Sequence, residues 1–234
     1  MSVTPDDLER QVAYLVSHGW RATTFSEAAL NPSGRRTLAI TFDDAFASVQ
    51  RYAVPILAHY GVPATVFVPT AHIDSGTLCW DGIEMWQNSP QASELQAMSW
   101  DELRGLAEQG WEIGSHTRTH PRLTQLDAEN LTLELEGSRE ELAEKLGRPS
   151  ETIAYPYGDV DARVAERAAS LGYLAGGALS SVLEPLGPYR HPRVGIYNGD
   201  SWWRFRLKMS RQMRDLRASR LWAQGIARAG RGRG

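Results

Sequence analysis

The chain has 234 residues, of which 42% are hydrophobic and 23% are charged, and its formal net charge is −3. This composition predicts one globular domain with a sizeable core, and the slightly acidic charge argues against a nucleic-acid-binding protein. Residues 1–30 lack the basic region and apolar core of a signal peptide, and the chain has no apolar run of about 18 residues, the length that spans a membrane. The sequence as given therefore predicts a cytoplasmic protein, and its single cysteine, Cys79, excludes an intramolecular disulfide.

Helix and strand patterns alternate along most of the chain. The first helix is expected over residues 4–19, with Thr4 as its N-cap, Pro5 at its first position and Gly19 after its end. The expected elements that follow are a short strand and turn at 20–30, a strand at 38–42, a helix at 45–60, a strand at 64–68, a helix at 99–109, a strand at 111–113, a helix at 127–146, a strand at 152–155, a helix at 162–171 and a strand at 173–178. Strands separated by helices pair in parallel through right-handed crossovers, so we expect a barrel-like α/β sheet.

Two segments of this pattern can be interpreted in more than one way. Residues 71–98 have no clear period, and Trp80 and Trp86 in this long loop either stack on a sugar ring or pack against the protein. The helix at 127–146 has leucines on one face and many acidic residues on the other. These acids are expected to form an ordinary solvated face.

The strand at 38–42 is followed by two adjacent carboxylates, Asp43 and Asp44. Two acids at the end of a buried apolar strand are costly unless a positive group lies beside them, and a metal ion is the expected group. Further along the chain, His116 and His120 follow the strand at 111–113, and one local turn can bring both imidazoles to the same side. Two imidazoles and one carboxylate leave coordination positions open for water and substrate, which suits metal-assisted hydrolysis.

Three motifs occur in the order seen in NodB-like polysaccharide deacetylases, which the chain resembles over roughly residues 4–197. The motifs are TFDD at 41–44, SHTRTH at 115–120 and AYPYGD at 154–159. The resemblance implies an irregular, incomplete (β/α) barrel of the NodB-homology type in a domain at 1–197. It also implies a hydrolase that removes N-acetyl groups from an N-acetylhexosamine-containing polysaccharide or glycoconjugate.

By this resemblance Asp44, His116 and His120 hold one divalent metal ion, and Asp43 is the base that takes a proton from the attacking water. The expected metal is zinc, with cobalt, nickel, iron and manganese as alternatives. A divalent ion lowers the pKa of bound water and polarises the carbonyl of the amide that is cleaved. Adjacent residues of a strand point to opposite faces, so the two aspartates can differ in role only if the strand ends or bends there.

The resemblance also suggests roles for residues later in the chain. The backbone N–H of Tyr157, in a turn that contains Pro156, corresponds to a donor to the oxyanion, although a purely structural turn is the alternative. Arg193 corresponds to an arginine that keeps Asp43 charged through a paired hydrogen bond, and a surface salt bridge is the alternative. The candidates for contact with the substrate are Trp80, Pro156 and His191.

One residue expected from the resemblance has no counterpart. Members of this family protonate the leaving amine with a second histidine, from a late Leu-x-His motif or from a Tyr-His pair on an N-terminal strand, and neither motif is present. Since Met1 falls where that strand should already have passed, a truncated chain is expected. Of the other histidines, His18 and His59 lie beside helix-ending glycines, and His72 and His191 are the candidates to replace the acid. Its loss would lower the rate by roughly 10²–10⁴.

The last segment, residues 198–234, is expected to form a tail outside this domain. From Ser201 onward it has ten lysines and arginines against one acid, Asp215, with apolar residues between them. This pattern predicts a basic amphipathic helix over 202–222, which either packs on the body or on a protein partner, or lies on an anionic membrane surface. Residues 228–234 are expected to be disordered.

Two functional alternatives stand beside the deacetylase. One is a non-catalytic or weakly active relative that binds carbohydrate, and the other is a hydrolase of a different non-peptide C–N bond. Metal binding does not separate the binding relative from an enzyme, whereas turnover of an acetylated sugar does. Nucleic-acid binding would depend only on the arginine-rich tail and is not expected, because the sequence has no recognisable reading module.

Overall fold

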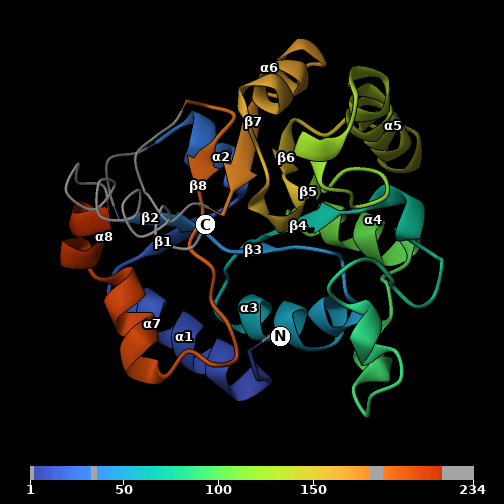
Figure 1. Cartoon of the computed structure of the whole chain (residues 1–234). Helices are drawn as coiled ribbons and strands as arrows, with labels where there is room; N and C mark the ends of the chain where they lie inside the picture. Colours follow the sequence, from blue (N-terminus) through green and yellow to red (C-terminus); the bar gives the residue numbers. More distant parts are fainter. Residues whose placement is uncertain (1–2, 33–35, 180–186, 218–234) are drawn as a thin grey trace, which may run out of the picture.

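Six parallel strands form one curled sheet at the centre of the protein (Figure 1). The structure is a computed structural model, which describes residues 3–32, 36–179 and 187–217. Their order in the sheet is that of the chain, namely β3 (Thr41–Phe42), β4 (Thr65–Val68), β5 (Glu112–Ser115), β6 (Thr152–Ala154), β7 (Ala175–Ala178) and β8 (His191–Pro192). A smaller parallel sheet pairs β1 (Arg21–Thr23) with β2 (Thr37–Ala39), and β2 continues through Ile40 into β3. The expected α/β fold with an incomplete barrel is confirmed.

Helices connect the strands and surround the sheet (Figure 1). They are α1 (Pro5–Ser17), α2 (Phe25–Leu30), α3 (Val54–His59), α4 (Trp100–Glu108), α5 (Ala128–Leu146) and α6 (Ala162–Ser170). Five of them begin at a residue whose side-chain oxygen accepts a hydrogen bond from an N–H three residues later, which satisfies a free donor of the first turn; these caps are Thr4, Thr24, Ser99, Asp127 and Asp161. On α5, Leu131, Leu135 and Leu142 are buried, as the helical period predicts.

The structure corrects three of the expected elements. Residues 25–30 form helix α2 in place of the expected strand and turn. The helix expected at 45–60 is a π-helical turn, Val49–Ala53, followed by α3. Pro55 has no N–H to donate to the carbonyl four residues earlier, and this break in the hydrogen-bond ladder accompanies the wider turn. The strand expected from residue 173 begins only at Ala175.

The basic tail forms two helices in its described part, α7 (Trp202–Met209) and α8 (Arg211–Arg217), because Ser210 is extended and breaks the expected single helix. Trp202 and Phe205 of α7 contact Tyr14 of α1 at ring-centroid distances of 5.3 and 6.0 Å, so this helix packs on the body. The predicted end of the helix at 218–222 and the predicted disorder at 228–234 lie outside the described residues. The domain boundary at residue 197 stays a prediction. In the ranges that the structure covers, no helix combines the length and apolar character that a membrane span needs.

Glu112 ties the beginnings of three strands together, at the opposite end of the sheet from Asp43 and Asp44. Its Oε2 accepts hydrogen bonds from the Thr65 hydroxyl at 3.0 Å and the Ser26 N–H at 2.8 Å. Its Oε1 accepts a hydrogen bond from the Thr152 hydroxyl at 2.5 Å. Thr65 begins β4 and Thr152 begins β6, so one carboxylate on β5 joins both neighbouring strands and the start of α2.

We expect Glu112→Leu to lower the free energy of unfolding by about 3 kcal/mol, because three part-buried donors lose a charged acceptor. Urea denaturation measures this change. The matched control is Glu108→Leu at the exposed end of α4, which should change stability by less than about 0.5 kcal/mol. Equal stability of the two variants would show that the Glu112 network does not hold the strand ends.

Candidate metal centre

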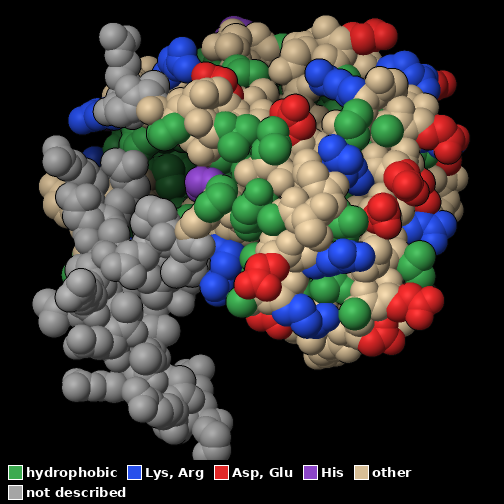
Figure 2. All heavy atoms as spheres, turned by 90° about the horizontal axis from the view of Figure 1, so that it is seen from above, with side chains coloured by type: hydrophobic (Ala, Val, Ile, Leu, Met, Phe, Trp, Pro, Cys, Tyr) green, Lys and Arg blue, Asp and Glu red, His purple; other side chains and the backbone are tan. Residues whose placement is uncertain are grey.

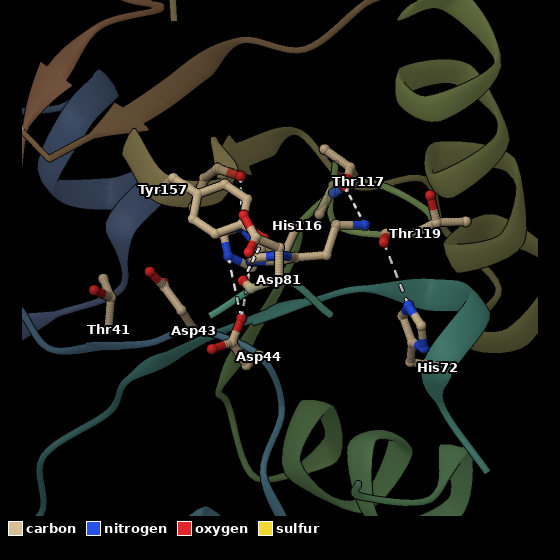
Figure 3. A network of polar contacts seen from close by, with 12 residues as sticks. Thr41, Asp43, Asp44, His72, Asp81, His116, Thr117, Thr119 and Tyr157 are labelled. Carbon is tan, nitrogen blue, oxygen red and sulfur yellow. Dashed lines mark hydrogen bonds and ion pairs between the residues drawn. The ribbon is translucent and has the colours of Figure 1, made fainter. Parts of the chain in front are cut away.

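The chain turns sharply directly after β3, where the two aspartates lie. Asp44 has φ +73° and Ala45 has φ +53°, a left-handed conformation that non-glycine residues seldom adopt. Because of this turn the two neighbouring carboxylates have different partners: Asp44 faces two imidazoles, whereas Asp43 lies to one side, near Thr41 (Figure 3). The condition that the strand ends or bends at this pair is therefore met.

Asp44, His116 and His120 converge on one point, and Figure 3 shows Asp44 facing His116. The Oδ1 atom of Asp44 lies 3.4 Å from Nε2 of His116 and 3.3 Å from Nε2 of His120, and the three candidate ligand atoms lie within 4.8 Å of one another. Nδ1 of His116 donates a hydrogen bond to the Ala154 carbonyl at 2.7 Å, so in the neutral form of the ring the lone pair is on Nε2, which faces Asp44.

These three residues fit a divalent cation. The Asp44 Oδ1 atom is buried and makes no hydrogen bond of acceptable geometry, although two ring nitrogens lie close to it. A carboxylate oxygen beside an imidazole lone pair is unfavourable unless a positive charge lies between them. One carboxylate and two imidazoles are also a common donor set for zinc and related metals.

Burial and the neighbouring charged groups shift the pKa values of Asp44 and His116 in opposite directions. Burial would raise the pKa of Asp44, but the two adjacent imidazoles hold it well below its usual range. Burial would lower the pKa of His116, and the carboxylates of Asp43 and Asp44 raise it above its ordinary value. Burial holds the pKa of His120 below its ordinary value. Asp44 therefore stays ionised, as a metal ligand must.

Asp43 forms a paired ion bridge with Arg193, which follows β8. The two guanidinium nitrogens donate to Oδ1 at 2.6 Å and to Oδ2 at 3.0 Å. The Arg193 side chain is only 9% exposed and that of Asp43 is 27% exposed, so the alternative of a surface salt bridge is wrong. Burial would raise the pKa of Asp43, but Arg193 and His116 bring it below its ordinary value. Asp43 is therefore held in its charged form.

Two adjacent glycines in β7 make room for large polar side chains inside the curled sheet. A Cβ atom on Gly177 would lie 2.9 Å from Cδ and Nε of Arg193, and a Cβ atom on Gly176 would lie 2.4 Å from the Tyr155 hydroxyl. Sequence analysis assigned no role to this pair. A glycine inside an apolar strand often indicates that another group approaches the backbone closely, and the sequence has two such glycines in the strand predicted at 173–178.

A cleft of about 690 Å³ opens beside His120, lined by residues from three loops. The Tyr157 hydroxyl donates to the backbone carbonyl of Asp81 at 2.8 Å, and the Arg122 guanidinium lies 4.1 Å from the centre of the Tyr157 ring. The Trp80 ring stacks on His120 at a centroid distance of 4.4 Å and an interplanar angle of 25°. Trp80 therefore packs on a candidate ligand, and Arg122 is a lining residue that sequence analysis missed.

The remaining candidate residues do not line this cleft. His72 is 3.4 Å from the Thr119 carbonyl and stands apart from Asp44 (Figure 3). His191 lies on β8 with its ring 6.1 Å from that of Phe25, and burial lowers its pKa. Pro156 is buried in the turn after β6. None of these three residues lines the cleft.

The Asp43–Arg193 pair makes stability depend on pH. Arg193→Met should lower the free energy of unfolding by about 2 kcal/mol at pH 7, because a partly buried carboxylate loses its partner. In the wild type the pair contributes fully above the unfolded pKa of about 3.8 and this contribution is lost as the pH falls through the lowered pKa of the folded state. The difference between the two proteins should therefore shrink in acid.

Urea denaturation of the metal-free proteins at pH 7 and at progressively lower pH measures this difference. The matched control is Arg104→Met, which breaks an ion pair with Asp101 whose side chains are 47% and 90% exposed. This control should change stability by less than about 1 kcal/mol. A destabilisation by Arg193→Met that is the same at every pH would contradict the ion-pair explanation.

Comparisons with known proteins give one consistent result. A family model described as polysaccharide deacetylase matches residues 30–176, more than half of the chain. A poly-beta-1,6-N-acetyl-D-glucosamine N-deacetylase of Staphylococcus aureus strain MRSA252 is 29% identical over 170 residues, which cover 67% of this chain and 54% of that protein. The chain thus spans about half the length of this relative.

Solved structures agree on the fold. The Streptococcus pyogenes deacetylase PplD in complex with acetate superposes with a TM-score of 0.74 at 23% identity, over 89% of this chain and 88% of that one. IcaB from Ammonifex degensii superposes with a TM-score of 0.68 at 22% identity, over 89% of this chain and 91% of that one. At these identities the likeness supports the incomplete barrel and says nothing of the substrate.

Proposed function

The chain belongs to the polysaccharide deacetylase family, and from this premise we propose that it is a metal-dependent hydrolase of N-acetyl groups on an N-acetylhexosamine-containing polysaccharide or glycoconjugate. The observation that carries the proposal is the convergence of Asp44, His116 and His120 beside the ionised Asp43. The S. aureus relative, which is named a deacetylase of poly-beta-1,6-N-acetyl-D-glucosamine, supports a polymer of N-acetylglucosamine as substrate.

In this proposal Asp44, His116 and His120 hold one divalent ion, with zinc as the first choice for this donor set. When bound, the ion supplies Lewis acidity and an acidified water molecule. The Ala154 carbonyl orients His116 through Nδ1, and the stacked Trp80 ring covers His120. Of the three residues, His120 also lines the cleft.

Asp43 is the proposed general base, which accepts the proton of the attacking water on a carboxylate oxygen. Arg193 positions this carboxylate and keeps it charged. The backbone N–H of Tyr157 is the proposed donor to the oxyanion, and its left-handed φ of +60° is held in a turn between Pro156 and Gly158. Base and oxyanion donor thus come from the turns after β3 and β6.

The cleft beside His120 is the proposed site for the sugar. Arg122, Gln125 and Asp81 supply polar groups there, and the edge of Tyr157 supplies an apolar surface. On the face shown in Figure 2, acidic and basic side chains of the described residues are interspersed, as suits a neutral glycan better than a nucleic acid.

A second candidate, a metal-holding carbohydrate-binding relative with little turnover, is favoured by one observation. All six histidines of the chain lie in the described ranges, and only His116 and His120, in the loop after β5, approach Asp44. No third imidazole of this chain lines the cleft to protonate the leaving amine. The two candidates share every other group, so only turnover separates them.

Zinc-loaded protein should release acetate from N-acetylglucosamine oligomers, and Asp43→Asn should lower kcat/KM by roughly 10²–10⁴ because the base is lost. The variant should still bind zinc, since Asp43 is not among the three converging donors. Enzymatic determination of acetate and zinc titration measure the two effects, with Asp101→Asn on exposed α4 as the control. Zinc binding without acetate release by the wild type would favour the binding relative.

Metal removal should abolish acetate release and lower the melting temperature, because binding to the folded state adds to its stability. Dialysis against a chelator followed by differential scanning fluorimetry tests this, and added zinc should restore both values. His120→Ala should show no response to zinc in the same assay. Full activity in the chelated, metal-free protein would overturn the metal-dependent mechanism.

A further inference from the structure

The loop that joins His116 to His120 has an unfavourable backbone conformation. Thr117 has φ +67° and His120 has φ +62°, and a β-branched residue such as threonine is a clear outlier in the left-handed region. Such conformations are strained and persist only where surrounding contacts fix them. The loop therefore needs strong external partners.

Glu134 of α5 supplies one set of these partners. Its Oε2 accepts hydrogen bonds from the backbone N–H groups of Arg118 at 2.9 Å and Thr119 at 2.8 Å. Its Oε1 accepts a hydrogen bond from the Thr119 hydroxyl at 2.6 Å. A single carboxylate thus satisfies three donors in the loop between the two candidate ligands.

Glu141, two helical turns further along α5, supplies the other set. It accepts a hydrogen bond from Nε of Arg118 at 2.6 Å and another from the Thr70 hydroxyl. The backbone N–H groups of Thr70 and Ala71 donate to the carbonyls of Thr117 at 3.2 Å and Arg118 at 2.9 Å. The expectation that the acids of this helix only face solvent is therefore wrong for Glu134 and Glu141.

His120 depends on this loop more than His116 does. Nδ1 of His116 has the Ala154 carbonyl as a partner, whereas Nδ1 of His120 is buried and has no hydrogen-bond partner among the described residues. A ligand histidine is usually oriented by a hydrogen bond at its second nitrogen. Without one, His120 is oriented by its own backbone and by ring packing with Trp80 and Tyr157.

We propose that Glu134 and Glu141 are positioning residues of the metal centre, which hold the 117–119 loop so that His116 and His120 both face Asp44. The inference rests on the proposed metal site, but it concerns how the ligands are held and not which substrate is cleaved. Neither glutamate belongs to the converging donor set. Their effect passes through the loop backbone.

The test compares Zn²⁺ affinity in Glu134→Ala, Glu134→Gln and Glu136→Ala, measured by competition with a chromophoric chelator. Glu136→Ala is the matched control, because Glu136 is exposed on the same helix and carries the same charge. Glu134→Ala should weaken Zn²⁺ binding about 10- to 100-fold, the usual effect of losing a group that orients a ligand. The control should bind as tightly as the wild type.

Glu134→Gln should restore most of the affinity. An amide oxygen in the place of Oε2 can accept both backbone hydrogen bonds, and the NH₂ group can donate to the Thr119 hydroxyl. Cobalt substitution gives a second readout, because the visible Co²⁺ spectrum reports the ligands. The Glu134→Ala spectrum should differ from that of the wild type, and the Glu134→Gln spectrum should match it.

Unchanged affinity and an unchanged Co²⁺ spectrum in a folded Glu134→Ala protein would overturn the proposal, even if the wild type is a deacetylase. A wild type that binds no metal would instead overturn the proposed function. If Glu134→Ala does not fold, Thr119→Val decides, because it removes only the hydroxyl bond to Glu134. Its affinity should then fall between those of the wild type and His120→Ala, and wild-type affinity would count against the proposal.

Discussion

The ion pair between Asp43 and Arg193 joins the two edges of the curled sheet. Asp43 follows β3 and Arg193 follows β8, the first and last strands in the sheet order. No ladder of backbone hydrogen bonds links these two strands in the described residues, so a buried side-chain pair connects the barrel where strand pairing does not. The absence of a side chain on Gly177 is what allows the guanidinium to reach across. The same contact keeps Asp43 ionised, which couples sheet architecture to the charge of the proposed base.

Left-handed backbone conformations recur at the strand ends that form the site. Asp44, Thr117, His120 and Tyr157 all have positive φ, and each lies in a turn that directly follows a strand. The cost of each such residue is offset by neighbours, such as Glu134 for the histidine loop and Pro156 for the turn at Tyr157. Strain at these positions is therefore distributed over the surrounding elements.

The sequence predicted the alternating elements and the position of the chemical motifs because both depend on local patterns. Apolar runs that stop at polar residues located the ends of β3, β5 and β6, and parallel strands bring such ends to one edge. The partners that come from distant elements were not predictable in the same way. Glu134 looks like any other acid on an amphipathic helix, and only the loop packed against it gives it a role. The π-helical turn before Pro55 likewise accompanies the missing N–H of that proline. The spacing of apolar residues, from which the helix was predicted, carries no information about this missing donor.

The site is asymmetric with respect to the two proton transfers that amide hydrolysis requires. In the proposed mechanism, attack by water has a base in Asp43, a positioning partner in Arg193 and a candidate oxyanion donor in Tyr157. Departure of the amine needs a proton donor, but in the cleft the Arg122 guanidinium lies over the Tyr157 ring and the Tyr157 hydroxyl donates to the Asp81 carbonyl. Arginine does not release a proton near neutral pH, and burial raises the pKa of Tyr157, with the Asp81 charge adding to the rise. The described residues are thus arranged for the first step of the reaction, and protonation of the leaving group is the step on which hydrolysis and mere binding diverge.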